Sequence, residues 1–224
     1  MKIVAICQAR LGSTRLPNKM LLPLAGAPLV QRVLERVSRS QSLAQIVLAF
    51  PEADAESFWP IVQANPRWSG YSDMGDEADL VGRYLKAARH YRADLIVRIP
   101  CDNPCVQAEY IDEAIATYRH CDVTFYSNTT ARYAGQYIDG LGAEVFSFNR
   151  LTLLDELTRG QALLREHPHR YFDYILPHAD IRLDVNTQAD YDFIADIYDH
   201  CYPRNEQFTI ADILAYLDTK KVPA

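Results

Sequence analysis

The chain has 224 residues, 49% of them hydrophobic and 23% charged, with a formal net charge of −6 at pH 7. This size and composition predict one globular domain over residues 1–224. The acidic balance argues against a nucleic-acid binder, and no apolar run reaches the ~20 residues that span a membrane. The five cysteines form no C-x-x-C pair and no secretory signal is visible, so we expect a cytoplasmic protein with reduced thiols.

In chain order, the first half alternates apolar runs with amphipathic segments. We expect strands at residues 3–7, 45–50, 68–71, 94–99 and 122–126, and helices starting at Pro28 and at 53–63, 76–91 and 107–118. This alternation predicts an α/β fold, a Rossmann-like three-layer sandwich with a mostly parallel sheet. In such sheets, ligands bind beyond the carboxyl ends of the strands.

The second half is less regular. Residues 127–142 are polar and rich in Gly and Tyr, which predicts a long loop of the kind that often acts as a lid. We expect strands at 143–148 and 181–185, and helices at 151–157, 163–176, 189–202 and 210–217.

The loop after the first strand is the first candidate site. It combines the triplet Gly12-Ser13-Thr14 with three cations, Arg10, Arg15 and Lys19, and has no acidic residue. Small residues let backbone N–H groups approach phosphate oxygens, and cations offset their charge, so the loop suits a triphosphate. On composition alone, a solvated basic loop explains the pattern equally well.

Asp102 is the second candidate. It follows the strand at 94–99, within the segment Pro100-Cys-Asp-Asn-Pro104. A carboxylate at the end of a parallel strand suits Mg²⁺, which prefers hard oxygen ligands and substrate phosphates. An Asx turn before a proline is the alternative.

The first loop also carries a resemblance. Its sequence Ala9-Arg-Leu-Gly-Ser-Thr-Arg-Leu-Pro-x-Lys19 resembles the signature loop of the cytidylyltransferases that activate acidic sugars. This family includes the acylneuraminate and 3-deoxy-manno-octulosonate enzymes, and the match is closest to the spore-coat polysaccharide SpsF-like branch. In the family the loop wraps the triphosphate of CTP. The resemblance therefore implies nucleotide contacts from Ala9, Arg10, Gly12, Ser13, Arg15 and Lys19.

Two further segments resemble the metal-binding motifs of this family. Residues 98–104 resemble Arg-x-x-Gly-Asp-x-Pro, in which the Asp is a metal ligand, although Cys101 replaces the Gly. The resemblance thus gives Asp102 both nucleotide and metal contacts. In the second motif, Asn186 stands where the family has a metal-binding Asp. Asp184 faces the same side of the expected strand and could supply the missing carboxylate, or it could simply pair with Arg182.

Other matches cover the rest of the chain. Residues 74–84 resemble Gly-x-Glu-x-Asp-Val-Leu-x-Arg-Tyr, and residues 139–148 resemble Asp-Gly-Leu-x-x-Glu-Val-Phe. A third match is Arg-Glu-His at 165–167. The resemblance places Asp79 at the nucleotide, and around the acceptor sugar it places Arg83, Asp139, Glu144, Arg165 and His167. Taken alone, Arg83, Arg165 and His167 are each more often surface or capping residues.

The resemblance implies a Mg²⁺-dependent enzyme that transfers CMP from CTP to an acidic sugar, with Arg10, Lys19 and Asp102 as catalytic residues. It also implies a role in surface polysaccharide biosynthesis and a possible homodimer. In the family, base contacts come largely from backbone and small residues near the first loop. Two alternatives remain: a catalytically impaired nucleotide- or sugar-binding subunit, which Cys101 and Asn186 would allow, and a transferase that uses UTP or GTP.

Overall fold

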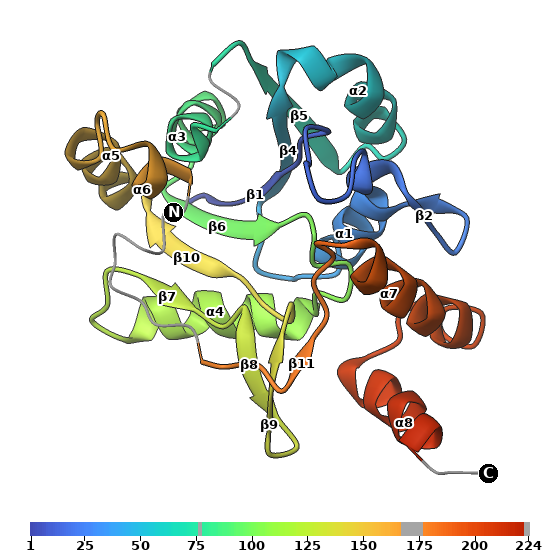
Figure 1. The fold of residues 1–224 in the computed structure, drawn as a ribbon. Coiled ribbons are helices and arrows are strands. Elements are labelled where there is room, and N and C mark those ends of the chain that lie inside the picture. The colour runs from blue at the N-terminus through green and yellow to red at the C-terminus, as the bar shows by residue number, and fades with distance from the viewer. Residues whose placement is uncertain (76–77, 167–176, 222–224) are drawn as a thin grey trace.

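The computed structural model describes residues 1–75, 78–166 and 177–221. Within them, a six-stranded central sheet has the order β5-β4-β1-β6-β10-β7 (Figure 1). Its strands are β1 (Ile3–Gln8), β4 (Gln45–Pro51), β5 (Trp68–Asp73), β6 (Leu95–Pro100), β7 (Tyr126–Ser127) and β10 (Glu144–Ser147). The first four pair in parallel, and β10 is antiparallel to both β6 and β7. The sheet is therefore mostly parallel, as expected.

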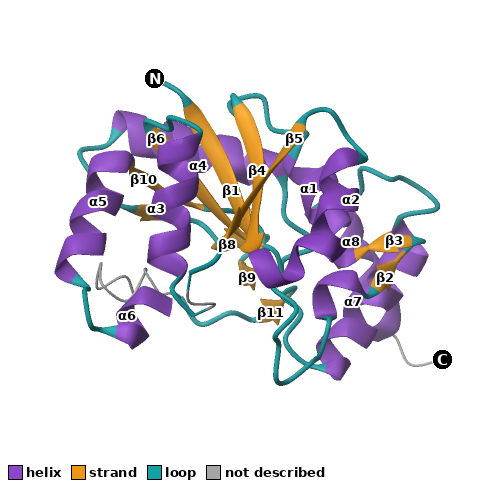
Figure 2. Cartoon of the chain, turned by 90° about the horizontal axis from the view of Figure 1, so that it is seen from above, coloured by secondary structure: helices purple, strands orange, loops and turns teal. Residues whose placement is uncertain are grey.

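Alternate residues of the central strands pack into two separate cores. Ile3, Ala5 and Cys7 of β1 face one core, and Val4 and Ile6 face the other. The first core includes residues of α1 (Leu29–Val37), α2 (Ala55–Gln63), α4 (Ala108–His120) and α7 (Gln188–Cys201); the second includes residues of α3 (Leu80–His90) and α5 (Phe148–Leu157). Because both faces of β1 are covered, its sequence is a continuous apolar run. The result is a three-layer sandwich. In Figure 2, α3 and α5 lie to the left of β1 and β4, and α1, α2 and α7 lie to their right.

Residues 127–142 do not form the expected long loop. They contain β8 (Thr130–Tyr133) and β9 (Gln136–Asp139), which pair as an antiparallel hairpin. The turn residues Ala134 and Gly135 both have positive φ, 49° and 86°, as a tight two-residue hairpin turn requires. β11 (Ile181–Arg182) adds to β9 in parallel and gives a second, three-stranded sheet.

Three other expectations need correction. The strand expected at 122–126 is reduced to β7, because residues 121–124 are exposed and lack a partner strand. The helix expected from residue 76 begins at Leu80, because the Asp79 side chain caps it by accepting from Gly82 N–H. The strand expected at 181–185 stops at Arg182; beyond it, the Val185 N–H donates to the Asp102 backbone oxygen instead (2.8 Å).

The remaining elements are short or lie near the end of the chain. They are β2 (Pro23–Leu24), β3 (Ala27–Pro28), the 3₁₀ turns Lys19–Leu21 and Glu52–Asp54, α6 (Ala162–Glu166) and α8 (Ile210–Lys221). α6 covers the start of the helix expected at 163–176, and residues 167–176 lie outside the described part of the chain. Among the described residues, no helix combines the length and apolar character needed to cross a membrane.

Candidate active site

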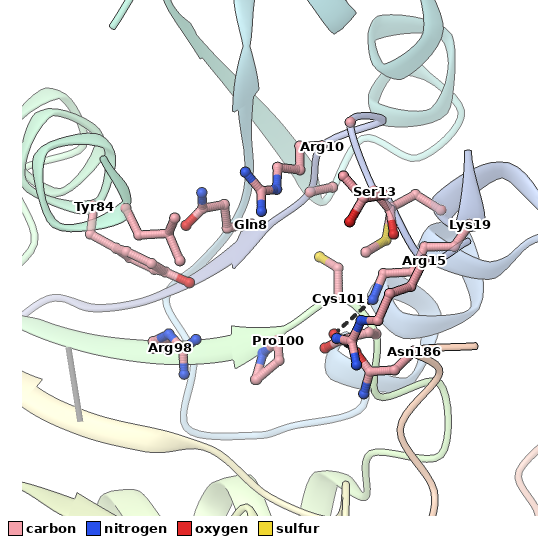
Figure 3. A pocket seen from close by; sticks show the side chains of 16 residues that line it. Gln8, Arg10, Ser13, Arg15, Lys19, Tyr84, Arg98, Pro100, Cys101 and Asn186 are labelled. Atoms are coloured by element: carbon pink, nitrogen blue, oxygen red, sulfur yellow. Dashed lines mark hydrogen bonds and ion pairs between the residues drawn. The ribbon is translucent and has the colours of Figure 1, made fainter. Parts of the chain in front are cut away.

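A pocket of about 600 Å³ lies at the carboxyl ends of β1 and β6 (Figure 3). Gln8 pairs with Pro100 at the ends of these strands, so the loops that follow them start side by side. Residues of both loops line this one pocket. Eight residues with a predicted nucleotide or metal contact line the pocket: Ala9, Arg10, Gly12, Ser13, Arg15, Lys19, Asp102 and Asn186.

Lys19 and Asp102 join three segments at this pocket. The Lys19 Nζ donates to Asp102 Oδ2 at 3.0 Å and to the Val185 backbone oxygen at 2.8 Å. The Lys19 side chain is only 11% exposed, which limits the competition of water for its ammonium group. The loop after β1, the loop after β6 and the segment before α7 are thus tied around one carboxylate.

Arg15 and Asn186 meet at the same end of the pocket. Arg15 Nη2 donates to Asn186 Oδ1 at 2.8 Å, and the Asn186 amide in turn donates to Asp184. Asp184 is held by the guanidinium of Arg182, at 2.7 and 3.0 Å. Of the two sequence-based alternatives for Asp184, the structure shows the pairing with Arg182, and Asp184 is not among the described residues that line the pocket.

The oxygen donors at this end suit a hard divalent cation bound with phosphates. Asp102 offers a carboxylate and Asn186 a neutral amide oxygen, and both line the pocket. The described residues contain no group of three or more His, Cys, Asp or Glu placed to hold a metal. Mg²⁺ bound here would therefore take most of its ligands from nucleotide phosphates and water, as it commonly does.

The opposite end of the pocket contains residues that the sequence reading missed. Arg98 and Tyr84 line it, and Arg98 Nη1 donates to Glu144 Oε1 at 2.7 Å. Burial disfavours the charge of Arg98, but the neighbouring Glu144 carboxylate outweighs it, and the pKa of Arg98 lies above its usual value. Burial also raises the pKa of Tyr84. The sequence did contain one signal for this end of the pocket: Arg98 is a charged residue inside an otherwise apolar strand.

Arg83 lies outside the set of described residues that line the pocket. Its side chain is fully buried, and its Nε donates to Asp73 Oδ1 at 2.9 Å. Lys86 Nζ donates to the other oxygen of Asp73 at 2.9 Å. Burial raises the pKa of Asp73, but hydrogen bonds from Lys86 and Arg83 more than offset this, so the net pKa is lowered. In this arrangement, Arg83 holds α3 against the end of β5.

Asp79 and Arg165 contact each other rather than the pocket. The guanidinium of Arg165 donates to both carboxylate oxygens of Asp79, at 2.8 and 2.9 Å, and to Asp155 Oδ1 at 2.8 Å. Burial opposes the charge of Asp79, but the hydrogen bonds from Arg165 and Gly82 N–H outweigh it, so the pKa of Asp79 lies below its usual value. This contact fastens α6 to the start of α3, next to the pocket residue Leu80.

Two other residues predicted to bind the sugar, Asp139 and Glu144, are not among the described residues that line the pocket. Asp139, at the end of β9, accepts from Thr130 Oγ1 at 2.9 Å and from Gly140 N–H at 3.0 Å. Burial raises its pKa. Glu144 lies behind Arg98, with its side chain 3% exposed. His167 lies outside the described residues.

The chain is similar to known cytidylyltransferases and to a protein of spore coat polysaccharide biosynthesis. Residues 4–205 match the model of a family described as cytidylyltransferase. The spore coat polysaccharide biosynthesis protein SpsF of Bacillus subtilis is 26% identical over 211 residues, which covers 88% of this chain and 86% of that protein. The 3-deoxy-manno-octulosonate cytidylyltransferase of Geobacter sulfurreducens is 36% identical over 118 residues, covering 52% of this chain and 45% of that protein. A solved cytidylyltransferase from Leptospira borgpetersenii superimposes with a TM-score of 0.83 at 26% identity, covering 98% of this chain and 95% of that one.

Proposed function

We propose that this chain, which belongs to the cytidylyltransferase family, transfers CMP from CTP to a hydroxyl group of an acidic sugar and releases pyrophosphate. The observation that carries the proposal is the convergence of Arg15, Lys19 and Asp102 at one end of a single pocket. The names of two relatives, SpsF and 3-deoxy-manno-octulosonate cytidylyltransferase, support an acidic sugar of a surface polysaccharide as the acceptor.

The chemistry needs charge neutralisation and positioning more than a protein nucleophile. The sugar hydroxyl attacks the α-phosphorus of CTP, a new oxygen–phosphorus bond forms, and the bond to the β-phosphate oxygen breaks. Arg10, Arg15 and Lys19 lie where they can hold the β- and γ-phosphates and stabilise the departing pyrophosphate. Ala9, Gly12 and Ser13 line the same wall, where small side chains leave room for the phosphates.

We assign Asp102, with the amide oxygen of Asn186, as the protein ligands of Mg²⁺. When bound, the ion would polarise the α-phosphate and lower the pKa of the attacking hydroxyl. We further propose that the chain is one domain, acts as a cytoplasmic homodimer, and contributes to polysaccharide biosynthesis. The contacts of the sugar with Arg83, Asp139, Glu144, Arg165 and His167 stay predictions from the resemblance.

A second candidate function is a nucleotide-binding subunit without chemistry. The observation that favours it is Asn186, whose side-chain oxygen accepts a hydrogen bond from Arg15 and carries no charge for a metal. Magnesium dependence separates the two functions, because a binding module has little need of a metal.

Thermal stabilisation by CTP, UTP, GTP and ATP, each with and without Mg²⁺, tests the proposed function. A nucleotide present at ~100 times its dissociation constant adds ~2.7 kcal/mol, which is easily seen as a melting shift. We expect the largest shift with CTP and Mg²⁺ together. If only UTP, GTP or ATP shifts the melting temperature, that nucleotide is the donor in place of CTP. If none of the four nucleotides shifts it, the proposal is contradicted.

A further inference from the structure

The pocket has two ends of different chemistry. Figure 3 shows Arg15, Lys19 and Asn186 on one side, and Gln8, Tyr84 and Arg98 on the other. The first group belongs to the phosphate end described above. The second group lies apart from the residues that we assign to the phosphates, so it is available to another part of a bound nucleotide or to the acceptor.

The second end is built on the face of the sheet that α3 covers. Val4 and Ile6 of β1 pack into the core on that face, and Gln8 is the next residue in the alternation. Ile6 pairs with Arg98 on β6, so Arg98 lies on the same face as Gln8 and two residues before it along the strand direction. α3 contributes Leu80 and Tyr84, which are four residues apart and hence share one side of the helix.

The charge at this end is balanced before any ligand enters. Arg98 is paired with Glu144 at 2.7 Å, and their side chains are 12% and 3% exposed. A second carboxylate, such as that of an acidic sugar, would meet the negative charge of Glu144 in a shielded setting. A neutral, planar, polar ring avoids this repulsion, and Leu80 and Tyr84 offer it apolar surface.

Gln8 and Arg98 each have a side-chain polar atom without a hydrogen-bond partner among the described residues. These atoms are Gln8 Oε1 and Arg98 Nε, and both are buried. Buried polar atoms in proteins are nearly always paired, and unpaired ones call for an explanation. The two atoms are an acceptor and a donor, which is what the polar edge of a pyrimidine can satisfy.

We propose that Gln8 and Arg98 recognise the cytosine base of the nucleotide at this end of the pocket, an inference that rests on the proposed function. The amino group of cytosine donates to Gln8 Oε1, and a ring acceptor of cytosine receives the N–H of Arg98 Nε. Uracil carries a carbonyl oxygen in place of the amino group, which faces the Gln8 oxygen unfavourably. Side chains of the two central strands, rather than backbone groups of the first loop alone, thus set the choice of base.

The test compares Gln8→Leu with wild type in equilibrium binding of CTP, UTP and inorganic tripolyphosphate, each with Mg²⁺. We expect Gln8→Leu to weaken CTP binding by about 10- to 100-fold, the range of one good base contact, and to bring the CTP/UTP affinity ratio toward one. Tripolyphosphate has no base, so its affinity should stay within about twofold, which also shows that the phosphate end is folded.

Gln45→Leu is the matched control, because Gln45 is a glutamine on the neighbouring strand β4 that donates to Ser69 Oγ outside the pocket (2.9 Å). It should leave all three affinities unchanged. If wild type binds CTP and Gln8→Leu binds it equally well, or if Gln8→Leu raises only the KM of the sugar, the inference is overturned and the proposed function stands. If wild type binds tripolyphosphate but no nucleotide, the proposed function fails and the inference fails with it.

Discussion

Lys19 and Asp102 are 83 positions apart in the sequence, yet the Lys19 Nζ lies 3.0 Å from Asp102 Oδ2. The contact joins the loop after β1 to the loop after β6, and Lys19 also donates to the Val185 backbone oxygen at 2.8 Å. A cation and a carboxylate thus lie together where we place the triphosphate and its metal. The predictions below start from this pair.

Asp102→Asn keeps the shape of the side chain and removes its charge. We expect turnover to fall by about 10²–10³-fold, the usual effect of removing one charge-positioning group in an active site. The measurement is steady-state pyrophosphate release. Asp122→Asn changes an exposed aspartate and serves as the control. Turnover within a few-fold of wild type in Asp102→Asn would contradict the metal role.

Asn186→Asp adds a carboxylate beside Asp102 in the pocket. We expect the Mg²⁺ concentration for half-maximal activity to fall by about tenfold, because affinity for hard cations rises with ligand charge. Asp184→Asn is the matched variant, since Asp184 pairs with Arg182 and is not among the described pocket residues. It should leave the Mg²⁺ requirement nearly unchanged. If Asp184→Asn raised the Mg²⁺ requirement and Asn186→Asp left it unchanged, Asp184 would be the ligand instead.

Arg83→Met tests whether Arg83 supports the fold. Its guanidinium is fully buried against Asp73, and removing it leaves that carboxylate with one fewer partner. We expect a loss of about 3 kcal/mol in the free energy of unfolding, measured by urea denaturation. Lys86→Met removes the other partner of Asp73. Because the Lys86 side chain is 47% exposed, this change should lower the free energy of unfolding by under about 1 kcal/mol. Unchanged stability with a raised sugar KM in Arg83→Met would favour the substrate role instead.

Asp79 should make stability fall in acid. Its folded-state pKa lies below the ordinary value of 3.8, so its contribution is fully present above that value and is lost as the pH falls through the folded-state pKa. Asp79→Asn can still cap α3 but loses the charge that faces Arg165. We expect it to be about 1–2 kcal/mol less stable than wild type at pH 7.

The matching measurement is the melting temperature of both proteins at pH 7 and pH 3. The difference between them should shrink at pH 3, because the unfolded chain, in which Asp79 has its ordinary pKa of 3.8, is largely protonated there at this residue. A difference that stays constant across this range would show that the Asp79–Arg165 pair does not contribute through its charge.

The sequence predicted the central sheet well because its strands are unambiguous. β1, β4 and β6 are apolar runs covered on both faces, and each was expected to within two residues. The hairpin of β8 and β9 was missed because its turn uses Ala134-Gly135, without the Asn or Asp that usually marks such turns. β11 was expected too long, since the apolar residues Leu183 and Val185 are buried without joining a ladder.

The grouping of Arg10, Arg15 and Lys19 could be predicted because these cations follow one another in one loop. Gln8 and Arg98 could not be found in this way, because their position depends on strand register and on which face α3 covers. The ion-pair partners of Arg83 and Arg165 could not be predicted from the sequence either. A guanidinium that pairs with Asp73 or Asp79 looks the same in a motif as one that faces a ligand.

The central claim is CMP transfer from CTP to an acidic sugar, and product analysis tests it most directly. The protein is incubated with CTP, Mg²⁺ and a panel of eight- and nine-carbon acidic sugars, and pyrophosphate and product masses are measured. The account predicts pyrophosphate release only when CTP and one of the acids are both present. It also predicts a product with the mass of that acid plus CMP minus water. CTP binding without pyrophosphate release for any of the acids would contradict it.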